Sequence, residues 1–106
     1  MIVMEKQRDL NNYGSYRAEV TTTSTSDAVI LRPHVKSTSV GLYATSGAYV
    51  EYTLSTLDKV EAGTADWIVW PLGVVSANST DSIMSTVTAV RAVSESGDSV
   101  TIEVVA

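Results

Sequence analysis

Apolar and polar residues alternate one by one along much of the chain. A side-chain period of two is the pattern of a β-strand with one buried face and one solvated face. The segments that follow this pattern are residues 16–20, 49–54, 86–93 and 100–105. In the second of them the apolar face consists of Val50, Tyr52 and Leu54, so we predict that these three side chains point towards a core.

Short apolar stretches predict strands in three other segments. Residues 28–31 form a continuous apolar run, residues 40–44 are strand-like, and residues 67–72 are strongly apolar. Pro71 lies in the last segment. Because proline has no N–H group to donate to a sheet, we predict that the far end of this strand lies at an edge or a bulge.

Turn-forming residues between these strands predict how the strands are connected. A Gly-containing turn at residues 45–48 predicts a hairpin, and the turn at residues 94–99 predicts a second hairpin at the C-terminus. The polar residues 22–27 and 76–82 predict loops. Residues 55–63 change to a spacing of three and end in a glycine, which predicts at most one helical turn.

Strand signals recur roughly every ten residues, which favours antiparallel β architectures over βαβ units. We predict an all-β fold, either an antiparallel β-sandwich or a jelly-roll-like barrel, with about seven to eight short strands. Residues 1–14 have no periodicity and end in a turn signal, so they form an extended N-terminal arm. Residues 15–106 then form a single β-sandwich domain, and the spacing of the strands leaves their order open.

The composition agrees with a β domain and removes several kinds of functional site. Serine and threonine make up about a quarter of the 106 residues, and valine is the commonest apolar residue. There is no cysteine and only one histidine, His34, which excludes thiolate and multi-histidine metal sites. The sequence has no Gly-x-Ser-x-Gly motif and no Gly-rich phosphate loop. We therefore expect no catalytic, cofactor-binding or metal-binding residues, no small-molecule substrate and no enzyme activity.

The charge is acidic overall and unevenly distributed. The net charge of -5 opposes nucleic acid or membrane as a partner. The first 36 residues contain five basic and four acidic residues, whereas the rest contains two basic and eight acidic ones. A near-neutral arm on an acidic body suits contact with a second copy of the chain or with an acidic partner, and the alternative is a solvated tail. Lys6, Arg8 and Tyr13 are the interface candidates in this arm.

The two tryptophans are the remaining interface candidates. Trp67 and Trp70 are three residues apart, so on a regular strand they point to opposite faces. One of them can fill the core while the other lies at a rim or a contact. An exposed tryptophan near Tyr43 or Tyr49 is suited to stacking on a sugar or to binding another protein. The alternative is that both tryptophans are partly buried in a small sandwich.

Several segments resemble small virion proteins of tailed bacteriophages. The resemblance rests on residues 48–55, 63–70, 87–93 and 96–98, and it covers roughly residues 47–106. It implies a β-sandwich with a structural role, a capsid decoration or cement protein. It transfers no catalytic or ligand-binding residue to this chain.

The resemblance also implies the protein's partners and location. The expected partners are the major capsid protein or other virion proteins, together with further copies of the chain in a homo-oligomer. The expected location is the virion, after assembly in the host cytoplasm. A head–tail connector, head-fibre base or tail component is the alternative within virions, and a carbohydrate-binding or adhesion module is the alternative from another class.

Overall fold

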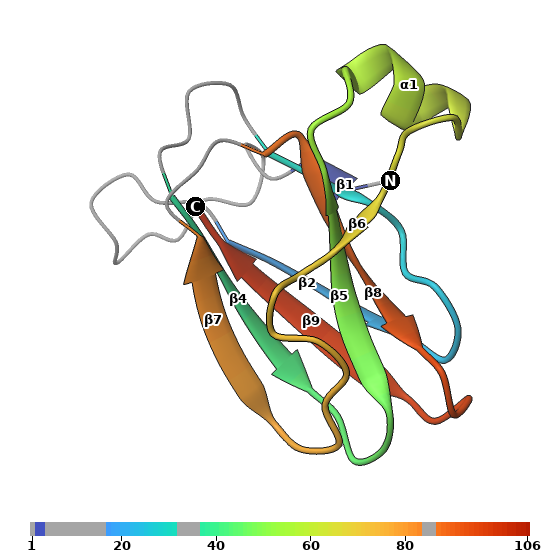
Figure 1. The fold of residues 1–106 in the computed structure, drawn as a ribbon, viewed down its shortest axis with the longest axis vertical. Coiled ribbons are helices and arrows are strands. Elements are labelled where there is room, and N and C mark those ends of the chain that lie inside the picture. The colour runs from blue at the N-terminus through green and yellow to red at the C-terminus, as the bar shows by residue number, and fades with distance from the viewer. Residues whose placement is uncertain (1, 4–16, 32–36, 84–86) are drawn as a thin grey trace.

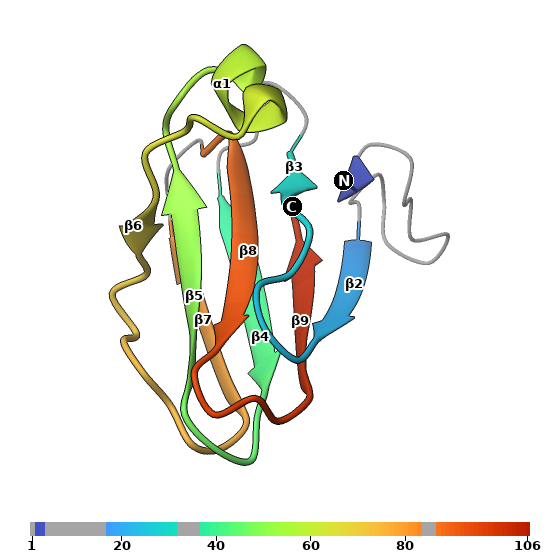
Figure 2. The same cartoon turned by 90° about the vertical axis from the view of Figure 1, so that its right-hand side faces the viewer.

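In the computed structural model the strands form two β-sheets that face each other (Figure 1, Figure 2). The structure describes residues 2–3, 17–31, 37–83 and 87–106. Within these ranges the elements are β1 (Ile2–Val3), β2 (Arg17–Thr22), β3 (Val29–Ile30), β4 (Thr38–Tyr43), β5 (Ala48–Thr53), α1 (Leu57–Ala62), β6 (Ile68–Val69), β7 (Ser79–Ile83), β8 (Ala89–Ser94) and β9 (Val100–Val105).

The strands pair in a nested order. β2 pairs with β9, β3 with β8, β4 with β7 and β5 with β6, all of them antiparallel. The pairs β4–β9 and β5–β8 extend these into two sheets, ordered β2-β9-β4-β7 and β1-β3-β8-β5-β6. This order, with β1 added at one edge, is the eight-stranded jelly-roll arrangement. The prediction of an all-β sandwich is confirmed, and the sheets remain open instead of closing into a barrel.

Alternate residues of the strands fill the space between the sheets. On β9, Val100, Ile102 and Val104 are buried, and the residues between them are only partly buried. Val40 and Leu42 of β4 are buried in the same core cluster. Full burial of a side chain of this size contributes roughly 1.5–3 kcal/mol, so the period-two pattern of the sequence is the main source of the sandwich's stability.

The helix α1 packs on the outside of the five-stranded sheet at one end of the sandwich (Figure 2). Its residue Val60 is buried in a small second cluster with Ile30 of β3 and Ala89 of β8. The helix ends at Gly63, which has a φ of 76° and donates its N–H to a carbonyl of the last turn. The predicted helical segment ending in this glycine is present, but its six residues exceed the single turn that was expected.

Both predicted hairpins are wrong. β4 and β5 belong to different sheets, and so do β8 and β9, so each turn leads the chain from one sheet to the other. The two turns lie beside each other at one end of the sandwich, where the Glu95 N–H donates to the Gly47 carbonyl over 3.0 Å. The Ser46 hydroxyl also donates to Asp98 over 2.6 Å. A turn signal marks a reversal of direction, and local sequence does not determine whether the strands on either side pair.

Two further segments differ from their predictions. Residues 76–82 were expected to form a loop, but most of them belong to β7, which pairs with β4 at the edge of the four-stranded sheet. Thr80 is exposed there, so this strand needs little apolar character. The predicted strand at residues 67–72 is reduced to the two residues of β6, which is an edge strand as the position of Pro71 indicates.

The structure describes only the start of the predicted N-terminal arm. Ile2–Val3 form β1, which lies parallel to β3 at the edge of the five-stranded sheet. These two residues therefore pair within their own domain rather than extending away from it. Residues 4–14 lie outside the described residues. Nowhere in the described ranges does a helix have the length and apolarity needed to cross a membrane.

Candidate binding surfaces

The five interface candidates from the sequence have three different outcomes. Lys6, Arg8 and Tyr13 lie outside the described residues. Trp67 is partly buried, and Trp70 is buried. The expectation that one tryptophan fills the core and the other lies at its rim is therefore confirmed.

Trp70 is the core residue of the two, so its side chain offers almost no surface to a partner. Only 1% of its surface is exposed. Its ring meets that of Tyr52 edge to face, with the centroids 5.6 Å apart and an interplanar angle of 82°. Its indole N–H donates to the Asp81 carboxylate over 2.6 Å. The apolar ring of Trp70 packs inside the molecule, and its N–H has a hydrogen-bond acceptor there.

Trp67 lies on the outer side of the five-stranded sheet, where one ring face is already occupied. The guanidinium carbon of Arg91 lies 4.1 Å from the ring centroid. Arg91 Nε in turn donates to Glu51 Oε1 over 2.8 Å, and the two residues are direct cross-strand partners. Trp67 also packs against the small cluster beneath α1. This stack fixes the orientation of the tryptophan and leaves only part of it for contact with a partner.

Exposed apolar side chains are concentrated in residues 54–74, the segment that runs from the end of β5 through α1 and β6. We call this group the apolar strip, and its members are Leu54, Leu57, Ile68, Val69 and Val74, which are 44–60% exposed. Within this segment α1 lies at one end of the sandwich, and β6 lies beside β5 at an edge of the five-stranded sheet (Figure 2). Several large apolar side chains exposed within one short segment are typical of a contact with another molecule.

The backbone at the apolar strip also has a free side. The N–H of Trp70 donates to the Val50 carbonyl, and Ile68 is the register partner of Tyr52. Because successive peptide groups of a strand point to alternate sides, the N–H and C=O of Val69 point away from β5. β6 has only two residues and is followed by Pro71. Such a short edge hinders the addition of a further strand, so contact here depends mainly on side chains.

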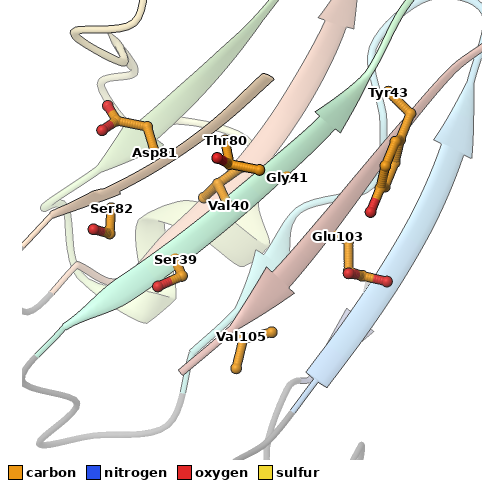
Figure 3. Close-up of a pocket in the computed structure, with 9 residues that line it drawn as sticks. All are labelled: Ser39, Val40, Gly41, Tyr43, Thr80, Asp81, Ser82, Glu103 and Val105. Atoms are coloured by element: carbon orange, nitrogen blue, oxygen red, sulfur yellow. The ribbon is translucent and has the colours of Figure 1, made fainter. Parts of the chain in front are cut away.

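A second surface is a groove of about 490 Å³ on the four-stranded sheet (Figure 3). We call it the sheet groove. Its lining comes from β4, β7 and β9 and consists of Ser39, Val40, Gly41, Tyr43, Thr80, Asp81, Ser82, Glu103 and Val105. Most of these positions alternate with core residues along their strands, so their side chains are on the outer face of the sheet.

The sheet groove is centred on Gly41. The register places Gly41 between Glu103 on one neighbouring strand and Thr80 on the other. Because glycine has no side chain, the cross-strand row Thr80–Gly41–Glu103 has a gap in its middle. The Tyr43 ring leans along its own strand, so that its hydroxyl lies 3.7 Å from where a Cβ of Gly41 would be. Tyr43 remains 43% exposed, and its hydroxyl points along the sheet in the direction of Glu103 (Figure 3).

Acidic side chains next to the groove are close together but too few for a metal cluster. Glu19 of β2 lies directly opposite Glu103 of β9 in the antiparallel register. Among the described residues there is no group of three or more His, Cys, Asp or Glu side chains that can hold a metal ion. His34 lies outside the described residues.

Comparisons with known proteins give similarity in fold only. No protein-family model matches the chain, and no curated protein matches it. Among solved structures the chain is similar to an oxalate oxidase, with 19% identity and a TM-score of 0.48 over 87% of this chain and 41% of that one. It is also similar to an oxalate oxidase in complex with the substrate analogue glycolate, with 18% identity and a TM-score of 0.44 over 86% and 39%. The chain thus spans less than half the length of these oxidases.

A third similar structure comes from Bacillus endospore appendages, which form disulfide-linked pili. The identity is 9% and the TM-score 0.42, with 86% of both chains covered. These similarities concern the arrangement of the strands. They do not show that this chain is an enzyme.

Both surfaces differ from what the residue pattern predicts, for identifiable reasons. Alternation from Val50 and Tyr52 assigned Leu54 to the core, but β5 ends at Thr53 and Leu54 is exposed. Ile68 and Val69 were expected to be part of a longer, strongly apolar strand, but β6 consists of these two residues alone. The sheet groove depends on strands that are far apart in the sequence, so only the register brings Gly41 beside Glu103.

Proposed function

We propose that the chain is a non-enzymatic structural protein of a tailed-phage virion, which decorates the capsid by binding virion proteins through the apolar strip. The observation that carries the proposal is the exposure of five large apolar side chains within residues 54–74. The resemblance of residues 47–106 to small phage virion proteins supports the same role. Viral capsid proteins are among the proteins that use the jelly-roll architecture, although the fold alone does not determine the function.

The chemistry of the apolar strip indicates what kind of surface it fits. Burial of the exposed half of each side chain contributes about 1 kcal/mol, so the strip supplies several kcal/mol to an interface. Asp58, Glu61 and Asp66 lie in the same part of the chain and are exposed. A partner that places an apolar surface against the strip, with basic residues at its rim, matches both features.

A binding experiment with capsids tests the proposal. Purified protein is mixed with capsids that lack it, prepared from the phage whose genome encodes the chain, and binding is measured by co-sedimentation. We expect the variant Ile68→Lys/Val69→Lys to lose binding, because it introduces two charges into the apolar strip. The control is Thr23→Lys/Thr25→Lys, which adds the same charge at exposed positions between β2 and β3 and retains binding.

The outcomes of this experiment separate the alternatives. Equal binding by both variants contradicts the role of the strip, and absence of the chain from purified virions contradicts the virion role. The copy number measured by quantitative mass spectrometry of the particle separates decoration from a connector, head-fibre base or tail component. A decoration protein is present in numbers comparable to the major capsid protein, whereas the other components form single rings or fibres.

A further inference from the structure

The sheet groove combines an exposed aromatic ring with hydroxyl groups and one carboxylate around a hollow. Tyr43 supplies the ring, and Ser39, Thr80 and Ser82 supply hydroxyl groups from two adjacent strands. Glu103 supplies the carboxylate. We propose that this groove binds a neutral sugar ring of a polysaccharide, separately from the apolar strip.

The shape of the groove admits a flat ring beside Tyr43. Gly41 leaves space between Glu103 and Thr80, and the Tyr43 ring lies against it, with its hydroxyl, Cε2 and Cζ atoms 3.7–3.9 Å from where a Cβ of Gly41 would be. The volume of about 490 Å³ is within the range of roughly 300–1,000 Å³ for sites that bind small molecules. A sugar ring packs its C–H groups against the aromatic face, and the strands hold that face in a fixed position.

The polar groups match the hydrogen-bonding needs of a sugar. Each hydroxyl of a sugar both donates and accepts, and the serine and threonine hydroxyls of the lining do the same. A carboxylate accepts strong, charge-assisted hydrogen bonds from two neighbouring hydroxyls. Glu103 lies in the same cross-strand row as Thr80, so a ring above Gly41 is within reach of groups on both sides.

The charge of the surface selects among possible ligands. Glu19 and Glu103 are direct cross-strand partners, and like charges in that arrangement destabilise a sheet. The two carboxylates repel phosphate and uronic acids, whereas they accept hydrogen bonds from a neutral sugar. The lining has one large exposed apolar side chain, Tyr43, and therefore lacks the apolar centre of a protein interface.

The test is affinity electrophoresis of the full chain in gels that contain one polysaccharide each. The neutral probes are dextran, laminarin, glycogen, galactomannan and xyloglucan, and the acidic probes are polygalacturonate and hyaluronate. We expect retardation by at least one neutral probe and by neither acidic probe. Retardation by no neutral probe, or by the acidic probes alone, overturns the proposal.

Three variants locate the binding in the groove. Tyr43→Ser removes the aromatic face, and Gly41→Val adds a side chain to the hollow while keeping the tyrosine in the sequence. A Cβ at Gly41 meets only ordinary contacts of 3.7 Å or more with the Tyr43 ring, and circular dichroism of the Gly41→Val protein checks that the fold is kept. We expect both to weaken sugar binding about tenfold or more. Tyr49→Ser is the control, because Tyr49 is a partly buried tyrosine on the other sheet and its loss leaves binding unchanged.

The same variants separate this inference from the capsid-binding proposal. Tyr43→Ser and Gly41→Val are expected to sediment with capsids like the unmodified chain, whereas Ile68→Lys/Val69→Lys is expected to keep its retardation by the sugar. Equal retardation of Tyr43→Ser and the unmodified chain overturns the sugar site. Loss of capsid binding by Gly41→Val also overturns it, because the groove is then a protein contact.

Discussion

The indole N–H of Trp70 donates a 2.6 Å hydrogen bond to the carboxylate of Asp81 and so joins the two sheets of the sandwich. Trp70 directly follows β6, and Asp81 is the middle residue of β7, so the bond links the two edge strands on one side of the molecule. Asp81 is the register partner of the buried residue Val40 and therefore points inward. An inward-pointing charge on an edge strand opposes pairing with other chains, and Trp70 supplies the partner that this charge needs.

We predict that Trp70→Phe lowers the free energy of unfolding by about 2 kcal/mol, because it leaves the partly buried carboxylate of Asp81 without its indole donor. The matched variant Asp81→Asn keeps an oxygen acceptor and is expected to cost less. Urea unfolding followed by far-ultraviolet circular dichroism measures both. A Trp70→Phe protein as stable as the unmodified chain contradicts the importance of this bond.

The sequence predicts the class of fold well because burial has a local signature. Val100, Ile102 and Val104 alternate with more exposed residues, and that alternation holds wherever a strand lies on one side of a core. Strand pairing has no such signature. The turn at Gly47 connects two sheets, and the same residues are compatible with a hairpin, so only the packing of the whole chain decides between them.

The binding surfaces are harder to predict from sequence than the core. Ile68 is as apolar as a core residue, and it is exposed because β6 is short and has a neighbour on only one side. Gly41 becomes the centre of a groove only through its register partners Thr80 and Glu103. The pairing of the Trp67 ring with Arg91 likewise joins residues from separate strands.

The stack of Trp67, Arg91 and Glu51 is expected to be a modest stabilising feature. Arg91→Met removes the charge and keeps most of the apolar length of the side chain. We predict a loss of up to about 1 kcal/mol in the free energy of unfolding, because a partly exposed ion pair and a cation–π contact are each weak. Lys59→Met, at an exposed position on α1, is the control and leaves stability unchanged.

The indole N–H resonances provide a second readout for this stack. The chain has two tryptophans, so its ¹H–¹⁵N spectrum contains two indole signals. Arg91→Met is expected to shift the signal of Trp67 and to leave that of Trp70 nearly unchanged, because only Trp67 lies against the guanidinium. Movement of both signals by equal amounts is evidence of a wider rearrangement and against a local stack.

Two glycines are expected to respond in opposite ways to the same substitution. Gly63 has a φ of 76° and ends α1, so Gly63→Ala forces a strained left-handed alanine and costs about 1 kcal/mol. Gly41 lies within β4, where a Cβ meets only ordinary contacts, so Gly41→Ala is neutral or slightly stabilising. Thermal unfolding of both variants measures the difference. Equal losses at both sites rule out backbone conformation as the cause.

Thr53 and Thr38 are two fully buried threonines with different hydrogen bonding, which gives a matched pair of substitutions. The Thr53 hydroxyl donates to the Asp66 carbonyl over 2.8 Å and accepts from the Ser55 N–H over 3.0 Å. It thereby holds together the two segments that carry Leu54 and the start of β6. The hydroxyl of Thr38 has no hydrogen-bond partner among the residues that the structure describes.

Substitution of each threonine by valine keeps the shape of the side chain and removes the hydroxyl. We predict that Thr53→Val costs about 1–3 kcal/mol, because it leaves a carbonyl and an N–H without their partner. Thr38→Val is expected to be neutral or stabilising, because it replaces a buried hydroxyl without a partner by a methyl group. Urea unfolding gives both values, and Thr53→Val is also expected to weaken capsid binding by disturbing the apolar strip. A Thr38→Val loss as large as that of Thr53→Val shows that the Thr38 hydroxyl has a partner, and the predicted difference then fails.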